Sequence, residues 1–254
     1  MSEQNRTALR VLVVMPAYNE GGTIGGVLTK LKVCAPDYEI VVVNDASTDN
    51  TGAVVDSLGV RQILQPEQSG YGRALQTGML YGIRRGFDVI VFMDADGQHD
   101  PTEARGLVDC LVRENADVVI GSRFMGRYCE DDSSAGRRIG MSLFSWATLL
   151  LTGRRIYDTT CGYKALKNKA CRGLVNIRFL DFHAEALVYL LHAGFVVKEY
   201  PVTVSRRTQG RSMYSAISYL KYPLRTLPLM FLALASAHLP QRDLPASGEQ
   251  ICRG

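Results

Sequence analysis

The chain has 254 residues, of which 46% are hydrophobic and 21% are charged, as is ordinary for a globular protein with a buried core. This composition excludes a chain that is disordered throughout, and we expect flexible sequence only at the two ends, 1–10 and 241–254. The formal net charge of +4 is small for a nucleic-acid-binding protein, so we expect no nucleic-acid partner.

Cysteine usage indicates a reducing compartment. The six cysteines form no CxxC pair and show no metal-ligand spacing, so most are expected to be small core residues. The first apolar run, Val11–Met15, is too short for a signal peptide. We therefore expect a cytoplasmic protein.

The first part of the chain alternates short apolar, β-branched runs with segments of helical length. We predict strands at 11–15, 39–43, 61–64 and 88–93, and helices at 20–32, 51–58 and 70–84. Thr23 is a candidate cap for the first helix. This alternation predicts an α/β fold with a doubly wound, mostly parallel sheet.

The pattern is looser in the second half. We predict helices at 102–115, 140–151 and 182–193, and strands at 117–121, 161–166 and 196–204. The apolar run 227–239 is shorter than the roughly 20 residues that span a bilayer. The run is interpreted either as an apolar helix at the membrane interface or as a C-terminal core helix.

Polar residues cluster where the predicted strands end. Tyr18 and Glu20 follow the first strand, Asp45 follows the second, and Asp94 and Asp96 follow the fourth. Ligands of doubly wound sheets bind at the carboxyl ends of the strands. These residues therefore mark the expected site.

Asp94 and Asp96 form an Asp-x-Asp pair directly after a buried strand. Two carboxylates there suit a hard cation such as Mg²⁺ or Mn²⁺, with a nucleoside diphosphate supplying further ligands. Loops after strands also favour Asp for turn formation, so the pair alone is a weak signal.

Arginines gather in two stretches of the second half, Arg123–Arg155 and Arg206–Arg211. Single surface arginines are usually only solvated. Two clusters that follow a phosphate-handling motif are more informative, because guanidinium groups match phosphate oxygens.

Several motifs together resemble the family 2 inverting glycosyltransferases with the GT-A fold. The motifs are MPAYNE (15–20), VNDASTDNT (43–51), GYGRA (70–74) and MDADGQHDP (93–101). GSRF (121–124) and RTQGRSM (207–213) extend the resemblance to dolichyl- and polyprenyl-phosphate sugar synthases. It covers roughly residues 10 to 215.

The resemblance implies a metal-dependent enzyme that transfers a sugar from a GDP- or UDP-sugar donor to a polyprenyl or dolichyl phosphate. It also implies a peripheral position on the cytoplasmic face of a membrane. The implied organisation is a transferase domain at 11–215 followed by an apolar, interfacial helical segment at 216–240. The sequence does not indicate an oligomeric state.

The resemblance also assigns roles to individual residues. The nucleoside would be held by Pro16, Tyr18, Glu20, Val43 and Asp45. Asp94 and Ala95 would lie at the ribose and diphosphate, and Asp94, Asp96 and Gln98 would bind the metal, with His99 only a loop residue. Arg123 would face the phosphates and Arg207 would close over the site, so the expected catalytic residues are Asp94, Asp96, Arg123 and Arg207.

The chain departs from the family pattern at Met213, where the synthases carry a lysine, and Arg211 is the candidate replacement. Asp158 and Glu185 could each act as a general base toward an acceptor hydroxyl. A phosphate acceptor is largely ionised and needs no base, so we favour a role in orienting Arg123 or the loop. Trp146 lies on an apolar helix and is expected to face the core or a membrane.

Three other functions are compatible with parts of this pattern. The first is transfer to a glycan hydroxyl in cell-wall or surface polysaccharide assembly. The second is a sugar-nucleotide pyrophosphorylase, but those enzymes carry a Gly-rich basic loop after the first strand, where this chain has MPAYNE. The third is a non-catalytic nucleotide- or glycan-binding protein, which the intact acidic and arginine sets disfavour.

Overall fold

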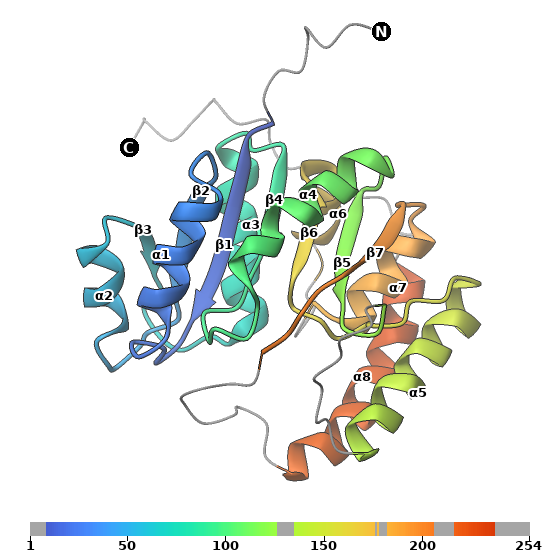
Figure 1. Ribbon diagram of the computed structural model, residues 1–254. Coiled ribbons are helices and arrows are strands. Elements are labelled where there is room, and N and C mark those ends of the chain that lie inside the picture. The colour runs from blue at the N-terminus through green and yellow to red at the C-terminus, as the bar shows by residue number, and fades with distance from the viewer. Residues whose placement is uncertain (1–8, 126–134, 176, 178–181, 206–215, 237–254) are drawn as a thin grey trace, which may run out of the picture.

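The computed structural model describes residues 9–125, 135–175, 177, 182–205 and 216–236. Its core is one seven-stranded sheet with the order β3-β2-β1-β4-β6-β5-β7 (Figure 1). The strands are β1 (Val11–Ala17), β2 (Glu39–Asn44), β3 (Arg61–Leu64), β4 (Val89–Phe92), β5 (Val118–Ser122), β6 (Lys164–Lys167) and β7 (Val197–Pro201). All described pairings are parallel except those of β6. The predicted mostly parallel α/β sheet is confirmed.

Helices cover both faces of the sheet, with α1 and α4 on one face and α3 and α6 on the other (Figure 1). The helices are α1 (Ile24–Cys34), α2 (Thr51–Ser57), α3 (Tyr71–Arg84), α4 (Ala104–Arg113), α5 (Ala135–Thr152), α6 (Asn168–Val175), α7 (Ala184–His192) and α8 (Ala216–Ser236), with a 3₁₀ turn, η2 (Pro101–Glu103), before α4. Helix α6 was not predicted, because its eight residues are fewer than the roughly 11 or more over which helical periodicity is recognised, although Ala170, Cys171, Leu174 and Val175 do form a buried face.

Strand β1 is the centre of the first half of the sheet. All seven of its residues are buried, and it pairs in parallel with β2 on one side and β4 on the other. Helix α3 packs closely on it through Gly78, where an added Cβ would come within 2.1 Å of Val14 Cγ1. The apolar, β-branched sequence of β1 thus forms a strand that is covered on both faces.

The first helix begins later than predicted. Helix α1 starts at Ile24, and Glu20 to Thr23 form a turn. Thr23 occupies the N-cap position, but its hydroxyl makes no capping bond and instead donates to the carbonyl oxygen of Ala95 at 3.0 Å. The turn after β1 is therefore tied to the acidic loop after β4.

Strand β6 runs antiparallel between β4 and β5 and begins at Lys164, three residues after the predicted start at Cys161. The strand lies in the sheet interior and its first three residues are buried. The sequence pattern of so short a strand does not determine whether it runs parallel or antiparallel to its neighbours.

Helix α8 is longer than the predicted apolar run. It begins at Ala216 and continues through Pro223 and Pro228 to Ser236. Its inner face joins α5 and α7 in a second, smaller core made of Phe144, Ala184, Val188 and Met230. Among the described residues, none of the helices combines the length and apolarity required to cross a bilayer. Because Met230 packs in this second core, the inner face of α8 is that of a core helix.

Candidate active site

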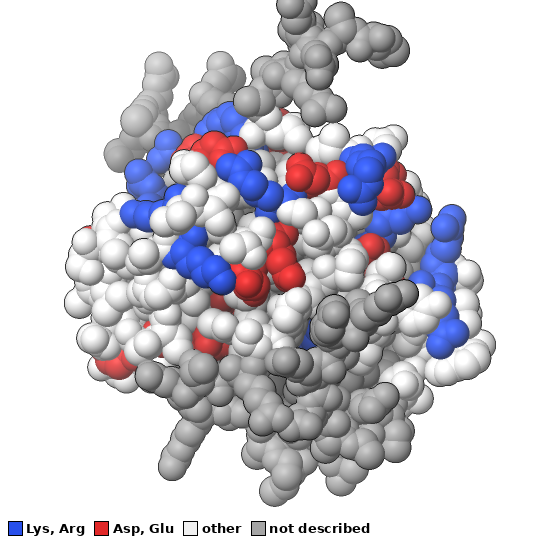
Figure 2. All heavy atoms as spheres, in the orientation of Figure 1, with Lys and Arg blue, Asp and Glu red and all other residues white. Residues whose placement is uncertain are grey.

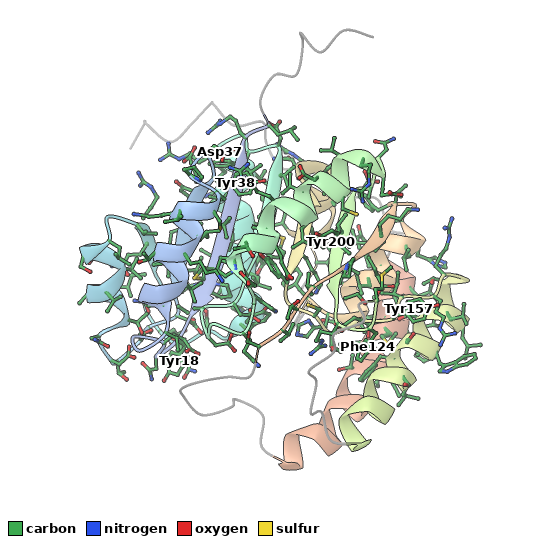
Figure 3. All side chains as sticks on the ribbon, in the orientation of Figure 1. Tyr18, Asp37, Tyr38, Phe124, Tyr157 and Tyr200 are labelled. Carbon is green, nitrogen blue, oxygen red and sulfur yellow. The ribbon has the colours of Figure 1, made fainter. Side chains whose placement is uncertain are left out.

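The predicted site residues follow strands whose carboxyl ends meet at one edge of the sheet. Tyr18 follows β1, Asp45 follows β2, Asp94 comes two residues after β4, and Arg123 follows β5. In Figure 3 Tyr18 lies near one end of this edge and Phe124, the neighbour of Arg123, lies toward the other. The fold thus places these residues along a single rim, as expected for this topology.

Asp45 anchors the turn that leads into α3. It is only 4% exposed and accepts hydrogen bonds from the backbone N–H of Ser69 at 2.8 Å, the Ser69 hydroxyl at 2.9 Å and the Gly70 N–H at 2.8 Å. Gly70 has a φ of 93°, a conformation that glycine adopts without steric cost. Asp45 therefore fixes the start of α3 beside the site.

Pro16 and Val43 are buried strand neighbours in the β1–β2 register. Toward a nucleoside they present main-chain atoms and an apolar surface, and no polar side-chain group. Tyr18 is half-buried at the end of β1, where its ring is available for stacking.

The segment that follows β1 is pinned to the loop after β2. The Asn19 side-chain oxygen accepts the Thr48 N–H at 2.8 Å, and the Glu20 N–H donates to the Thr51 hydroxyl at 2.8 Å. Asn19 has a φ of 55°, which asparagine tolerates better than most residues. Its structural role was not predicted, although its place in the first motif marked the position.

Asp94 is held from two directions. Its side chain is 31% exposed, and one carboxylate oxygen accepts the Tyr71 hydroxyl at 3.1 Å. Its backbone N–H donates to His99 Nδ1 at 3.2 Å, so this nitrogen is already engaged. The buried His99 ring stacks on Tyr163 at a centroid distance of 4.8 Å. His99 is thus packed between the loop after β4 and Tyr163, and its exclusion from the metal ligands stays a prediction.

Gly162 forms part of the surface against which Asp94 packs. A Cβ at this position would lie 2.8 Å from both an Asp94 carboxylate oxygen and the Tyr71 hydroxyl oxygen. Only glycine leaves room for this arrangement. The contact of Gly162 with Asp94 joins residues that are far apart along the chain, so the sequence did not indicate it.

Asp96 and Gln98 shape the acidic loop. One Asp96 oxygen accepts the Gln98 N–H at 3.0 Å, while the Gln98 side chain donates to the Ser205 carbonyl at 3.2 Å. Ser205 returns a backbone bond to the Gln98 carbonyl at 2.8 Å. The loop is thus joined to the segment that leads to Arg207, and Arg207, Arg211 and Met213 lie outside the described residues.

No group of three or more His, Cys, Asp or Glu side chains with the arrangement of a metal site occurs within the ranges that the structure describes. The oxygen atoms of Asp94, Asp96 and Gln98 nevertheless form a donor set of the kind that hard cations prefer. Mg²⁺ commonly takes only one or two protein carboxylates and completes its shell with substrate phosphates and water. The residues present fit such an ion.

Arg123 and Asp158 form a buried ion pair. Asp158 is 0% exposed, and it accepts Arg123 Nε at 2.7 Å and a terminal guanidinium nitrogen at 2.8 Å. That nitrogen also donates to the Thr160 hydroxyl at 2.9 Å. Burial opposes the charge of Asp158, but the bonds and charge of Arg123 outweigh it and hold the pKa of this carboxyl below its usual value. Asp158 therefore orients Arg123, as favoured from the sequence.

Lys164 and Glu185 lie deeper in the protein. Lys164 is buried, and its ammonium donates to the Phe182 carbonyl at 2.7 Å. Burial lowers the pKa of Lys164. Glu185 is 2% exposed in the first turn of α7. Lys164 was not predicted, since a single lysine in an apolar run gives no signal of its buried partner.

The sheet order, the acidic loop after β4 and the arginine after β5 define a glycosyltransferase of the GT-A type. The model of "Glycosyl transferase family 2" matches residues 12–174, and the chain belongs to this family. It is an enzyme that transfers a glycosyl group.

Curated relatives and solved structures agree with this assignment. The chain is 31% identical over 220 residues to the polyprenol monophosphomannose synthase of Mycolicibacterium smegmatis, with 83% of each chain covered. It is 30% identical to the undecaprenyl-phosphate mannosyltransferase of Micrococcus luteus, covering 82% of this chain and 88% of that one. Glucosyl-3-phosphoglycerate synthase from Mycobacterium tuberculosis, solved with Mn²⁺, UDP and phosphoglyceric acid, aligns with a TM-score of 0.64 at 19% identity, covering 92% of this chain and 81% of that one. The last similarity concerns the fold alone.

Proposed function

We propose that this enzyme transfers a sugar from a nucleoside diphosphate sugar, GDP- or UDP-linked, to the phosphate of a polyprenyl phosphate. The observation that supports it best is the set of site residues along one sheet rim, in which Asp94 and Arg123 are each fixed by contacts within the protein. The polyprenyl-phosphate names of the relatives agree with it.

Asp94, Asp96 and Gln98 would hold a Mg²⁺ or Mn²⁺ ion. A divalent ion at this place neutralises charge on a departing diphosphate. Pro16, Tyr18, Glu20, Val43 and Asp45 would hold the nucleoside, with Ala95 near the ribose and diphosphate. Arg123 would stabilise phosphate charge, and Arg207 would cover the site.

The state of the two candidate bases favours a phosphate acceptor. Asp158 has both carboxylate oxygens bonded to Arg123 and a lowered pKa, so it is a poor proton acceptor. Glu185 is almost fully buried. A phosphate oxygen is already ionised near neutral pH and attacks without a general base. A sugar hydroxyl acceptor would need a base that neither residue provides in this arrangement.

The test is a transfer assay with radiolabelled GDP- and UDP-sugars, undecaprenyl phosphate and Mn²⁺ or Mg²⁺. We expect label in an organic-extractable, mild-acid-labile product, and its loss with EDTA. The variant D96N should lose at least about 100-fold in turnover, while D37N, at an exposed carboxylate, should not. Label found only in a water-soluble glycan would support the hydroxyl-acceptor alternative. Full activity of D96N in EDTA would exclude the metal role.

We further propose that the α5 and α8 surface contacts a membrane. Leu143, Trp146 and Leu150 are 44%, 54% and 82% exposed and recur on one face of α5. Phe231 and Leu232 are 61% and 63% exposed on α8. Interfacial helices present such apolar and aromatic side chains to lipid. The segment 216–240 would thus add lipid contact to a transferase domain at 11–215.

Basic groups accompany this surface. Arg154 and Arg155 follow α5 and are exposed, and the Arg155 guanidinium lies 5.4 Å from the Trp146 ring centroid and 4.9 Å from that of Tyr157. Elsewhere on the visible face Lys and Arg alternate with Asp and Glu (Figure 2). Apolar and cationic groups side by side suit an anionic lipid surface.

Flotation with vesicles of phosphatidylcholine and phosphatidylglycerol tests this contact. We expect the protein to float with the vesicles, and the double variant W146S/L150S to float less, while V33S, at an exposed residue of α1, floats like the wild type. Equal flotation of all three proteins would contradict the proposed surface.

A further inference from the structure

Glu199 on β7 makes a symmetric contact that neither the motifs nor the proposed mechanism uses. One of its carboxylate oxygens accepts the backbone N–H of Tyr157 at 2.9 Å, and the other accepts the N–H of Asp158 at 2.9 Å. Glu199 is half-buried and lies opposite Ile120 in the parallel β5–β7 pairing. A single side chain therefore fixes two successive peptide groups of the segment after α5.

The residues of that segment alternate in burial. Ile156 is 4% exposed, Tyr157 is 47% exposed and Asp158 is 0% exposed, as in an extended chain whose side chains point to opposite sides. Figure 3 shows Tyr157 beside α5, on the same side of the molecule as Phe124. Because Glu199 fixes the peptide groups at 157 and 158, it determines that the Asp158 side chain points inward.

The inward side chain then determines the position of Arg123. Asp158 bonds the Arg123 backbone N–H at 3.1 Å in addition to two guanidinium nitrogens. The contacts run from β7 through the segment at 157–158 to the residue that follows β5. Because β5 and β7 are paired neighbours, both ends of this chain of contacts lie on adjacent strands of the sheet.

We propose that Glu199 is a positioning residue, which holds Asp158 and through it sets the guanidinium of Arg123 for phosphate binding. The inference rests on the proposed phosphate role of Arg123. The contacts that hold Arg123 are independent of that role and can be tested without substrate.

Burial raises the pKa of Glu199, whereas the two backbone N–H bonds favour its charged form. Replacing this carboxylate by an amide keeps the size of the side chain but leaves one N–H facing an NH₂ group. E199Q should therefore loosen the segment at 157–158 without leaving a cavity at position 199. K198Q, at the exposed neighbour on the same strand, is the matched control.

The first measurement is hydrogen exchange of the Arg123 Nε–H by NMR, with the signal assigned by its absence in R123K. A guanidinium held in a buried pair exchanges slowly, because exchange requires local opening. We expect exchange to be roughly tenfold faster in E199Q and unchanged in K198Q. Unchanged exchange in E199Q would overturn the proposal, whatever the enzyme's substrate.

The second measurement is a double-mutant cycle in the transfer assay, with KM and kcat determined separately. Misplacing a site group by about 1 Å can cost up to about 100-fold, so E199Q should lose roughly tenfold in kcat/KM. In an R123K background E199Q should lose less than about twofold more, because both changes act on one contact chain. Equal losses in both backgrounds would overturn the action through Arg123.

E199D provides the second variant if E199Q does not fold. It keeps both oxygens on a shorter side chain, and we expect the Arg123 Nε–H to exchange faster than in the wild type and kcat/KM to fall. A folded E199D protein with wild-type exchange and wild-type kcat/KM would contradict the positioning role.

Discussion

The two halves of the sheet hold their site residues in different ways. In the half made of β1 to β4, Asp45 and Asn19 bind the backbone of neighbouring loops. In the half made of β5 to β7, Arg123 is held by the buried carboxylate of Asp158, and the backbone N–H of Asp158 is held in turn by Glu199 on β7. In the first half polar side chains bind loop backbone, whereas the second half contains a buried ion pair between two side chains. Loss of one charged group should therefore cost more in the second half.

The largest expected effect is that of D158N. Removing one partner of a buried pair leaves the other charge uncompensated, which typically costs about 3–5 kcal/mol. We expect the free energy of unfolding in urea to fall by about this amount and transfer activity to be lost. The control is E39Q at the exposed Arg10–Glu39 pair, 3.3 Å apart, where exposed pairs contribute about 0–1 kcal/mol. Similar losses in both variants would remove the distinction between the halves.

In the first half, close packing should matter more than charge. G78A places a methyl group 2.1 Å from Val14 Cγ1, and overpacking of this kind costs about 1–3 kcal/mol. G26A adds the same group on α1 with nothing within 4 Å, and should gain up to about 1 kcal/mol from helix propensity. Urea unfolding measures the free energy of unfolding, which we expect to fall in G78A and to rise in G26A. A stabilised G78A protein would show that α3 moves away from β1 at little cost.

Much of the first half was predictable from the sequence. Strand β1 is an unbroken apolar run and β3 was predicted with its observed bounds, Arg61–Leu64, because periodicity and local turn residues determine such elements. The positions of Asp45, Asp94 and Asp96 at the rim were predicted for the same reason, since each lies directly after a strand or in the loop that follows it.

The second half was less predictable, because its determinants are long-range. The antiparallel direction of β6 depends on its neighbours β4 and β5 and not on its own pattern. The roles of Gly162 and Glu199 exist only in the folded chain, where each meets residues from another segment. A single glycine or glutamate in a sequence does not indicate such a partner.

Y71F tests whether Asp94, in the first half, depends on a side-chain contact as Arg123 does. The variant removes the hydroxyl that donates to the Asp94 carboxylate at 3.1 Å. Hydrogen bonds to charged groups are worth about 1.5–3 kcal/mol, and partial exposure of Asp94 reduces this, so we expect about tenfold weaker binding of UDP or GDP with Mn²⁺. Calorimetric titration measures it, with Y81F on the same helix as control. Unchanged affinity would mean that the backbone of the acidic loop alone holds Asp94.

The smallest expected effect concerns Asp117, which lies just before β5 and accepts the Val196 N–H at 3.0 Å and the Lys169 ammonium at 2.7 Å. Burial opposes its charge, but the Lys169 bond and the Val196 N–H outweigh it, so the pKa of Asp117 lies below the usual 3.8. A lowered pKa in the folded state stabilises the fold above 3.8 and loses this contribution as the pH falls through the folded value. The wild type should therefore be more stable than D117N near neutral pH, and the difference should shrink in acid. K169M, which leaves the Val196 bond in place, should show a smaller pH dependence than the wild type. A difference that stayed constant with pH would show that Asp117 acts through its shape and not through its charge, contrary to the dependence on buried charge that distinguishes this half of the sheet.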